Sequence, residues 1–343
     1  MAIKNSAPTQ NARILSVGAY RPPRIVPNSE LVERIDSSDE WIRQRTGIQT
    51  RHWAADDESV TDMAVKASRI AIDRAGITAQ EIDTIIFATI TYPYQTPSAS
   101  TEVAEQLDIK GAAAFDIGAA CAGFSYSLGL ANDMIRSGSA KYVLVIGAEK
   151  ISDFLDLDDR GTSFIFADGA GAVVVAPSEE IGIGPTIMGS DVDNREAISM
   201  VPSWIAYKPG AELHDLAWPV IHQEGQKVFR WAVYEVAKVG KEIITKSGLT
   251  PSDIAAFIPH QANERIIDSL AKSMELPDSV IIARDIRTTG NTSAASIPLA
   301  MDALLEEHPE LHGKNALLIG FGAGLVYAGQ VVELPALPKH APQ

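Results

Sequence analysis

Cys121, His260 and Asn291 have side chains that could together attack a carbonyl and stabilise the charge that forms on its oxygen. Cys121 is the one cysteine of the 343-residue chain, and the small residues around it at 116–125 lead into a helical pattern. A thiol at the start of a helix feels the positive end of the macrodipole, which favours the nucleophilic thiolate. His260 follows a short apolar run and Asn291 follows a glycine. The histidine, between an apolar strand and a predicted helix, is placed for acid–base work or for stabilising an oxyanion.

Each of these three residues also has an ordinary structural interpretation. A lone cysteine is usually buried and inert. A lone histidine at a strand end is more often a hydrogen-bonded core residue, and Asn291 alone is best explained as a turn or N-cap residue. The case for chemistry rests on the set, because all three follow predicted strands, and α/β sheets bind ligands beyond the carboxyl ends of their strands.

Alternating apolar runs and helical periodicity predict the elements that must position this set. We predict strands at residues 82–90, 113–117, 142–148, 170–176, 255–259, 280–283, 316–320 and 325–332. We predict helices at residues 60–75, 98–107, 122–137, 226–247, 263–274 and 294–307. This alternation is typical of an α/β fold with mostly parallel sheets covered by helices. The proline-containing segment 178–223 is predicted as a long loop, either a cover over a pocket or a surface excursion.

The sequence contains an internal repeat. Residues 71–88 and 243–260 share a helical run, a glycine C-cap and an apolar strand, so that Gly76 corresponds to Gly248. Further matches follow in the same order at nearly the same spacing, which is half the chain. We therefore predict two homologous halves, residues 1–180 with the cysteine and residues 181–343 with the histidine and asparagine. A pseudo-two-fold axis between them would bring the three residues to one site.

Composition excludes several classes of function. The net charge of −15 argues against a general nucleic-acid or anionic-membrane binder, because both need a positive field. One cysteine excludes an intrachain disulfide, a CxxC redox pair, an iron–sulfur site and a cysteine zinc finger. The first eight residues lack the apolar core of an export signal, and no apolar run is long enough to span a membrane. We expect a cytoplasmic protein.

Two further sequence patterns are candidate ligand sites. The glycines at 320, 322 and 324 follow a predicted strand and predict a tight turn whose N–H groups can face an oxyanion. They do not form a dinucleotide fingerprint, because Leu325 interrupts the spacing. His308 and His312 are four residues apart, but Pro309 lies between them and acidic residues surround them. We expect no metal site.

The chain resembles the β-ketoacyl-acyl carrier protein synthase III family of the thiolase-like superfamily. The resemblance rests on the Cys121 segment and on several further runs in the family's order, at residues 38–42, 45–48, 159–162, 166–172, 259–263 and 290–295. It implies a five-layered α-β-α-β-α fold from two duplicated halves, and a homodimer. It also implies the reaction: an acyl-CoA primer condenses with malonyl-acyl carrier protein to give 3-oxoacyl-carrier protein, CO2 and CoA. The acyl-CoA and the malonyl-carrier protein are substrates, and no cofactor is expected.

The resemblance also implies a role for individual residues. Cys121 would carry the acyl group, with its own N–H and that of Ala323 as the oxyanion hole. His260 and Asn291 would stabilise the malonyl enolate. Phe321 would pack near the sulfur or serve only the core. For CoA, Trp41 and Arg160 would flank the adenine, Arg45 would reach the phosphates and Asn263 the pantetheine arm; each could instead be a surface or capping residue.

Two expectations concern specificity. The acidic carrier protein needs a local basic patch, for which the candidates are Arg265, Lys272, Arg230 and Lys227, although a solvated helix face is the ordinary interpretation of such charges. Thr96 occupies a place where acetyl-preferring relatives often carry a bulky Phe, at the pocket floor across the dimer. A smaller residue there predicts a branched or medium-chain primer.

Three alternatives stand beside this interpretation. Papain-like proteases use Cys, His and Asn in the same chain order, but they are usually exported and disulfide-bearing. A related thiolase-like enzyme of secondary metabolism, such as a type III polyketide synthase or a polyketide-priming ketosynthase, is closer. A catalytically silent partner subunit is the third, but it need not keep Cys121, His260 and Asn291 together.

Overall fold

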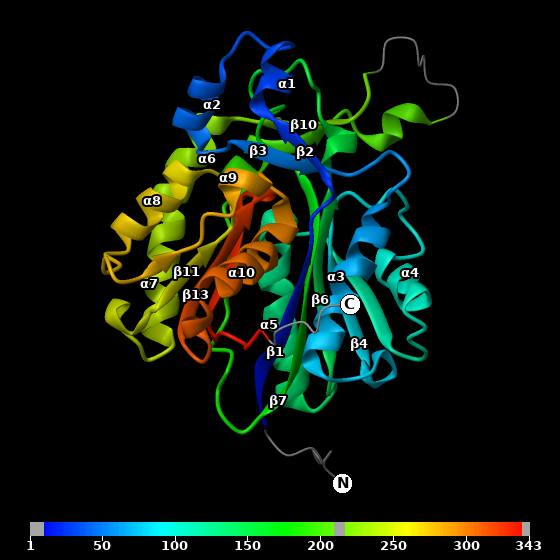
Figure 1. Cartoon of the computed structure of the whole chain (residues 1–343), viewed down its shortest axis with the longest axis vertical. Coiled ribbons are helices and arrows are strands. Elements are labelled where there is room, and N and C mark those ends of the chain that lie inside the picture. The colour runs from blue at the N-terminus through cyan, green and yellow to red at the C-terminus, as the bar shows by residue number, and fades with distance from the viewer. Residues whose placement is uncertain (1–9, 209–216, 338–343) are drawn as a thin grey trace.

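Two mixed five-stranded sheets form the frame of the computed structural model, which describes residues 10–208 and 217–337 (Figure 1). The first sheet contains β1 (Asn11–Tyr20), β7 (Asp168–Ser178), β6 (Val143–Lys150), β4 (Thr84–Ala88) and β5 (Ala113–Ile117), in that spatial order. The second contains β12 (Ile281–Ile282), β11 (Ala256–Pro259), β13 (Asn315–Gly322), β14 (Val326–Glu333) and β8 (Ile187–Ser190). Two antiparallel two-stranded sheets lie outside them, β2 (Arg24–Pro27) with β3 (Thr50–Trp53) and β9 (Ile198–Val201) with β10 (Val220–Gln223).

The two sheets have the same plan. In the first, β5, β4 and β6 are parallel, and β7 and β1 then follow in antiparallel pairings. In the second, β12, β11 and β13 are parallel, followed by antiparallel β14 and β8. This match supports the predicted halves at residues 1–180 and 181–343, and the boundary itself stays a prediction.

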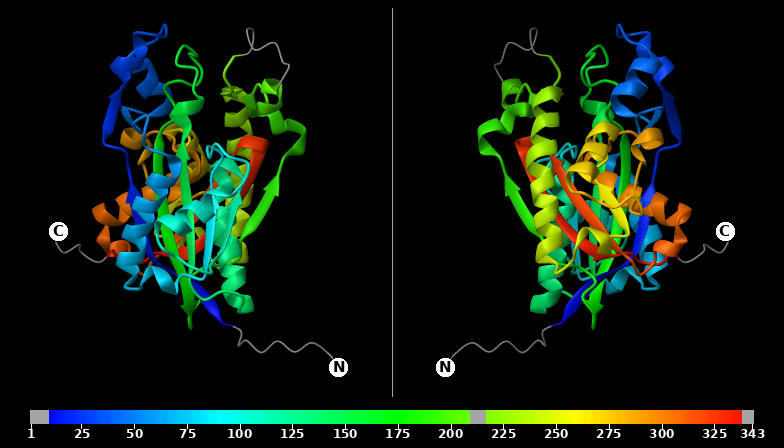
Figure 2. Two further views of the ribbon diagram at one scale, coloured as in Figure 1. Left: turned by 90° about the vertical axis from the view of Figure 1, so that its right-hand side faces the viewer. Right: turned by 90° about the vertical axis from the view of Figure 1, so that its left-hand side faces the viewer.

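Helices separate and cover the sheets in five layers (Figures 1 and 2). The central helices α5 (Gly123–Ser137) and α10 (Ser296–Glu307) contact strands of both sheets. The outer face of the first sheet is covered by α3 (Val60–Ala75) and α4 (Ala99–Gln106), and that of the second by α7 (Ala237–Lys246) and α8 (Glu264–Ser273). The remaining helices are α1 (Asn28–Val32), α2 (Asp39–Thr46), α6 (Gly225–Trp231) and α9 (Ile286–Thr289). The resulting α-β-α-β-α order is the one that the resemblance implies.

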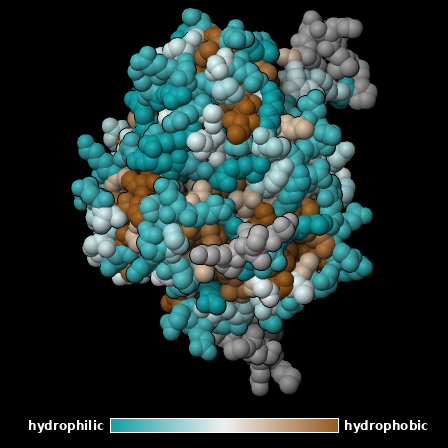
Figure 3. Space-filling model, in the orientation of Figure 1, coloured by the Kyte–Doolittle hydropathy of each residue, from teal (hydrophilic) through white to brown (hydrophobic). Residues whose placement is uncertain are grey.

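Local sequence signals account for these elements. Helix α3 begins at a capping box of Ser59 and Asp62 and ends at Gly76, whose φ of +68° suits a left-handed C-cap. The β6 strand is buried along its whole length, as a central strand covered on both faces must be. Three apolar clusters fill the spaces between the layers. The face of the molecule shown in Figure 3 is mostly hydrophilic, with apolar patches between polar areas.

The structure corrects three parts of the sequence-based outline. Segment 178–223 is not a plain loop, because β8 joins the second sheet and β9 pairs with β10; residues 209–216 of that segment lie outside the described residues. The helix predicted at 226–247 is interrupted by a π-helical turn at Ala232–Val236. The strands β1, β2 and β3 were not predicted. The first eight residues, used above to argue against export, also lie outside the described part.

Within the described ranges, no helix combines the length and the apolar character needed to cross a bilayer. In the same ranges, no cluster of three or more His, Cys, Asp or Glu side chains is arranged to hold a metal ion.

Candidate active site

Cys121 lies in a 3-10 turn, Ala120–Ala122, between the end of β5 and the start of α5, and its side chain is buried. The end of β13 passes directly against it. A Cβ added at Gly322 would lie 2.6 Å from Cys121 Cβ and 2.8 Å from its sulfur, and one at Gly320 would lie 2.8 Å from Ala122 Cα. Both positions therefore require glycine, because any side chain would push the strand away from the thiol.

Burial dominates the electrostatics of the thiol and raises the pKa of Cys121 to about 11. The Ser293 side chain and the backbone N–H groups of Cys121 and Ala323 act on the sulfur in the opposite direction. These backbone N–H groups, the first of them at the helix start, favour the thiolate in the expected direction, but desolvation outweighs them and the net pKa is raised. The same two N–H groups are the pair named above as the oxyanion hole, and both reach the sulfur.

His260 follows β11 and is anchored by its own N–H, which donates to the Ile319 carbonyl at 2.8 Å. Its Nδ1 lies 2.7 Å from Ser296 Oγ, and that oxygen accepts the Gln261 N–H at 3.3 Å. The Ser296 hydroxyl can donate its hydrogen to Nδ1, and in that tautomer the ring proton is on Nε2, where it is a donor. Burial lowers the pKa of His260 to about 3, so the ring is neutral at physiological pH.

Asn291 is held by the backbone on both sides. Its N–H donates to the Ile165 carbonyl at 3.0 Å, and its own carbonyl accepts the Ala167 N–H at 2.9 Å. The side-chain Oδ1 accepts the Ser293 N–H at 2.9 Å. This bond settles the orientation of the amide, so Nδ2 is the end that remains free to donate into the cavity.

These three residues share one cavity of about 540 Å³ that runs from Cys121 toward α2, α6 and α8. Its other predicted members are Trp41, Arg45, Asn263, Arg230, Arg265 and Phe321. A smaller apolar cavity of about 60 Å³ continues from Cys121 between Ile90, Met200 and Ala323. Cys121 and His260 follow β5 and β11, as predicted, whereas Asn291 follows α9, because β12 ends at Ile282 and a helical turn intervenes. The packing of the two halves brings these three segments to one cavity.

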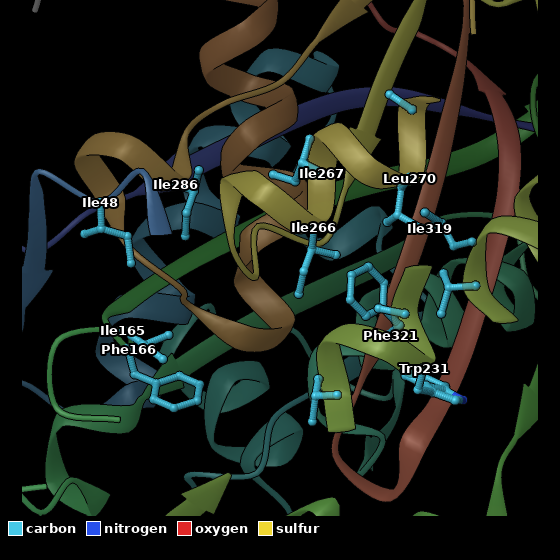
Figure 4. Packing of buried hydrophobic residues seen from close by; sticks show 14 of the residues in the cluster. Ile48, Ile165, Phe166, Trp231, Ile266, Ile267, Leu270, Ile286, Ile319 and Phe321 are labelled. Atoms are coloured by element: carbon cyan, nitrogen blue, oxygen red, sulfur yellow. The ribbon is translucent and has the colours of Figure 1, made fainter. Parts of the chain in front are cut away.

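Phe321 forms part of the wall beside His260. The two rings meet edge to face with centroids 5.3 Å apart, and Trp231 packs against Phe321 at 6.3 Å. Figure 4 shows Phe321 and Trp231 next to each other, with Ile266 of α8 nearby. Phe321 is buried, and it both packs the core and shapes the cavity at the imidazole.

Three of the predicted CoA residues form one aromatic and basic group. The guanidinium carbons of Arg160 and Arg45 lie 5.3 and 5.7 Å from the centre of the Trp41 ring. A base stacked between Trp41 and Arg160 needs about 7 Å, twice the ordinary contact distance. The Arg160 side chain, which also lies 3.6 Å from Asp36, would have to move outward to admit it.

Asn263 acts as a structural cap in addition to lining the cavity. Its Oδ1 accepts the Arg265 N–H at 2.9 Å at the start of α8, and its Nδ2 donates to the Arg45 carbonyl at 3.0 Å. It therefore ties α8 to α2, which is the capping alternative given above. Any contact with a pantetheine arm would come in addition to these bonds.

Four predicted residues line neither of these two cavities: Thr96, Lys272, Arg160 and Lys227. Thr96 is exposed on the loop after β4, and Lys272 is exposed on α8, away from the cavity mouth. By contrast, the exposed guanidinium groups of Arg230 and Arg265 line the mouth, and Arg265 lies over the Phe229 ring at 5.6 Å. Arg160 stands outside the lining, although its neighbour Gly161 contributes to it.

Three polar residues near the site were missed by sequence reasoning. Ser296 orients His260, Ser293 reaches the sulfur, and Glu149 at the end of β6 is fully buried. Burial raises the pKa of Glu149 to about 7 against four hydrogen bonds that lower it. The available signal for Glu149 was an acidic residue directly after the apolar run 142–148.

Known proteins are similar to this chain over nearly its whole length. Residues 115–192 match the family model "3-Oxoacyl-[acyl-carrier-protein (ACP)] synthase III", and residues 244–334 match the model of its C-terminal part. A β-ketoacyl-[acyl-carrier-protein] synthase III of Streptomyces glaucescens is 57% identical, covering 97% of this chain and 99% of the relative. One from Kocuria rhizophila is 51% identical over 97% and 99% of the two chains.

Solved structures agree with these relatives. The priming β-ketosynthase from the R1128 polyketide biosynthetic pathway is 44% identical, with a TM-score of 0.93 over 97% of this chain and 99% of the other. The 3-oxoacyl-[acyl-carrier-protein] synthase III from Aquifex aeolicus is 38% identical, with a TM-score of 0.86 over 94% and 99%.

Proposed function

Because the chain belongs to the β-ketoacyl-acyl carrier protein synthase III family, we propose that Cys121, His260 and Asn291 perform its two half-reactions in the cavity described above. Membership makes the chain a condensing acyltransferase with the thiolase-like fold. The observation that carries the residue-level proposal is the convergence of the three side chains on one cavity from three separate segments, two that follow β5 and β11 and one that follows α9.

In the first half-reaction, Cys121 attacks the thioester carbon of an acyl-CoA. The oxyanion of the tetrahedral intermediate is held by the N–H groups of Cys121 and Ala323, and CoA leaves. Covalent catalysis divides a difficult transfer into two easier steps. The apolar cavity beyond the sulfur receives the acyl chain, since its lining of Ile90, Ile151, Ile221 and Met200 offers a dry wall.

In the second half-reaction, malonyl-carrier protein enters the emptied cavity. His260 Nε2–H and Asn291 Nδ2–H donate to the malonyl thioester oxygen, and the enolate that forms as CO2 leaves attacks the acyl-cysteine. Neutral His260 suits this role, because a fixed N–H donor is needed and no proton has to be transferred. Loss of CO2 supplies the drive, so this chemistry needs no metal or redox cofactor.

The substrates reach the site through the cavity mouth. We assign the CoA adenine to the Trp41 and Arg160 faces and the phosphates to Arg45, on the strength of the group these three side chains form. Arg265 and Arg230 at the mouth offer the positive charge that an acidic carrier protein needs on a chain of net charge −15. Lys272 and Lys227 would extend that patch.

Arg265→Glu tests the docking role. It is expected to slow condensation with malonyl-carrier protein about tenfold at low salt and to leave acyl-CoA loading of Cys121 unchanged, because only the first step is independent of the carrier protein. Lys238→Glu, a reversal on the solvent-exposed face of α7, is the matched control. Equal condensation rates for Arg265→Glu and wild type would remove Arg265 from the docking surface.

We further propose a homodimer and a primer longer or more branched than acetyl, acting in the cytoplasm. Strand β5 is an edge strand with partly exposed Phe115 and Ile117, so pairing with a second copy would satisfy that edge. Thr96 would then reach the acyl cavity of the partner. Thr96→Phe should shift the preference in kcat/KM toward acetyl-CoA, and the primer hypothesis fails where the wild-type chain already prefers acetyl-CoA to isobutyryl-, isovaleryl- and longer primers.

A second candidate function is the priming of a dedicated polyketide or other secondary product, favoured by the 44% identity to a polyketide-priming ketosynthase. One experiment addresses both. The protein is incubated with a panel of acyl-CoAs, the mass added to Cys121 is measured, and malonyl-carrier proteins from a fatty-acid and a polyketide system are then compared. An absent adduct, or one that persists in Cys121→Ala, would overturn the central proposal.

A further inference from the structure

Glu149 is a fully buried acidic group beside the nucleophile, and no step described above uses it. Its Oε2 accepts three hydrogen bonds, from the Ile90 N–H at 3.0 Å, the Thr89 hydroxyl at 3.0 Å and the Thr91 hydroxyl at 2.8 Å. Its Oε1 accepts the Ser293 hydroxyl at 3.1 Å, the one such donor to this atom among the described residues. One oxygen is thus saturated, and the other keeps a lone pair free.

The surrounding bonds fix the direction of the threonine hydroxyls. Thr91 Oγ1 accepts the Lys150 N–H at 2.9 Å, and Thr89 Oγ1 accepts the Thr91 N–H at 3.2 Å. Each hydroxyl hydrogen is therefore available to Glu149. A carboxyl group surrounded by donors acts as an acceptor, so the site is built to hold the ionised carboxylate despite its burial.

Ser293 connects this carboxylate to Cys121. It begins the 3-10 turn Ser293–Ala295, which packs against both the Cys121 turn and β6. Ser293 and Cys121 line the same small apolar cavity, and the turns that carry them pack against each other. The Ser293 hydroxyl hydrogen is donated to Glu149 Oε1, so the serine oxygen keeps lone pairs that can accept the thiol hydrogen. The order in space is sulfur, hydroxyl, carboxylate.

We propose that Ser293 and Glu149 form a relay that takes the thiol proton of Cys121 as the sulfur attacks the acyl-CoA. The Sγ–H bond breaks as the Sγ–acyl bond forms, the proton passes to Ser293 Oγ, and the serine proton passes to Glu149 Oε1. The acyl–CoA sulfur bond then breaks, and CoA leaves as a thiolate that takes a proton from water at the cavity mouth. This inference rests on the proposed acylation of Cys121.

The stored proton has a use in the second half-reaction. When the enolate carbon attacks the acyl-cysteine, the collapsing intermediate expels Cys121 as a thiolate. The proton on Glu149 returns through Ser293 and restores the thiol and the carboxylate. Over both half-reactions the enzyme is unchanged. The malonyl carboxylate leaves as CO2, and one proton from water is taken up by the CoA thiolate.

The titration of the groups supports such a relay. Burial raises the pKa of the Cys121 thiol to about 11, so the thiol is the dominant form at pH 7. A base is therefore needed, and burial raises the pKa of Glu149 to about 7, near the operating pH at which a general base works best.

Other charged groups near Glu149 are directed elsewhere. Asp168, at the start of β7, accepts hydrogen bonds from Ala54 and Ser152. The ammonium group of Lys150, at the end of β6, donates to the carbonyls of Ala55 and Asp56. His260, on the other side of Cys121, is neutral because burial lowers its pKa to about 3.

The decisive variant is Glu149→Gln, assayed by the rate at which isobutyryl-CoA adds mass to Cys121 between pH 6 and 9. The wild-type rate should rise with pH and level off above about 7.5, as the carboxylate becomes ionised. The Gln variant should load about 10² to 10³ times more slowly at pH 7 and keep rising to pH 9, since it depends on the thiol alone. If the Gln variant loads as fast as wild type, or faster, the relay is wrong. In that case Glu149 acts only as a negative charge that raises the thiol pKa, and its removal favours the thiolate.

Companion variants separate the relay from packing. Ser293→Ala should show the same slow, rising profile, whereas Ser125→Ala, which removes a buried hydroxyl without a partner near Cys121, should load like wild type. Thr91→Val removes one donor to the carboxylate and should shift the ascending limb upward by about one pH unit. Glu149→Asp should recover part of the rate.

Two failures can be told apart. A wild-type protein that gains no acyl mass contradicts the proposed function itself. A wild-type protein that loads while Glu149→Gln and Ser293→Ala load equally well contradicts the relay alone. Melting temperatures are measured for every variant, and where Glu149→Gln does not fold, Ser293→Ala and Thr91→Val decide the outcome.

Discussion

The contact between Gly322 and Cys121 makes Gly322→Ala the most direct test of the oxyanion hole. The added Cβ would meet Cys121 Cβ at 2.6 Å. Ordinary carbon contact begins near 3.5 Å, so the end of β13 must separate from the Cys121 turn by about 0.9 Å. Ala323, the next residue, carries the second N–H of the proposed oxyanion hole and would move with the strand.

The magnitude follows from that displacement. A hydrogen bond of about 2.9 Å lengthened by about 0.9 Å is effectively lost. Loss of one oxyanion donor costs about 10²- to 10³-fold in rate, so we expect loading of Cys121 to slow by about 10²-fold. Condensation should slow as well, because the acyl-cysteine carbonyl uses the same donors. Overpacking should also lower the free energy of unfolding by about 1–3 kcal/mol.

The assay is stopped-flow release of CoA in a single turnover, checked by the mass of the Cys121 adduct. Gly329→Ala is the matched control, because its Cβ would meet Leu318 O and Ile243 Cδ1 at 2.6 Å in the same sheet but away from Cys121. It should lose stability and load normally. Loading by Gly322→Ala within about fivefold of wild type, or equal slowing in both variants, would refute the argument from the N–H of Ala323.

Three further predictions concern His260 and the interior. The pKa of His260 is about 3 in the folded protein, below the unfolded value near 6.5, so its contribution to stability is present above pH 6.5 and is lost as the pH falls. At pH 5, urea unfolding should show about 2 kcal/mol less stability from this group, and His260→Gln should lack this pH dependence. Ser296→Ala should slow malonyl decarboxylation about tenfold and spare loading, because Nδ1 loses the hydroxyl that keeps the proton on Nε2; unchanged decarboxylation would contradict this tautomer. Arg74→Met should cost about 3–5 kcal/mol in urea unfolding, because it leaves the buried Asp302 without its partner, and adding Asp302→Leu should restore most of that loss.

Much of the fold could be predicted because its signals are local. The strand at 113–117 and the helix at 60–75 were predicted with the bounds that the structure has. The helix carries its own cap residues, and the strand is a short apolar run between turns. The family resemblance, and with it the five layers, is confirmed by the relatives at 51–57% identity.

The missed elements depend on distant partners. Strand β8 is four residues long, alternates between exposed and half-buried positions, and pairs with β14 far along the chain. Nothing in its own sequence distinguishes it from the surrounding segment. The π-helical turn that follows Trp231 could not be predicted either, because one extra residue in a single turn hardly changes the helical periodicity of the sequence.

The candidate site divides along the same line. Cys121, His260 and Asn291 could be found because each matches a family motif, and the first two also follow strands; the helix α9 before Asn291 was not predicted. The ionisation of Cys121 could not, because the local dipole favours the thiolate while burial by β13, seen only in the folded chain, opposes it more strongly. A nucleophile enclosed this deeply gains a dry acyl site and loses its easy ionisation. That loss gives the buried Glu149 a physical reason to lie within reach, through Ser293, of a thiol 28 residues before it in the sequence.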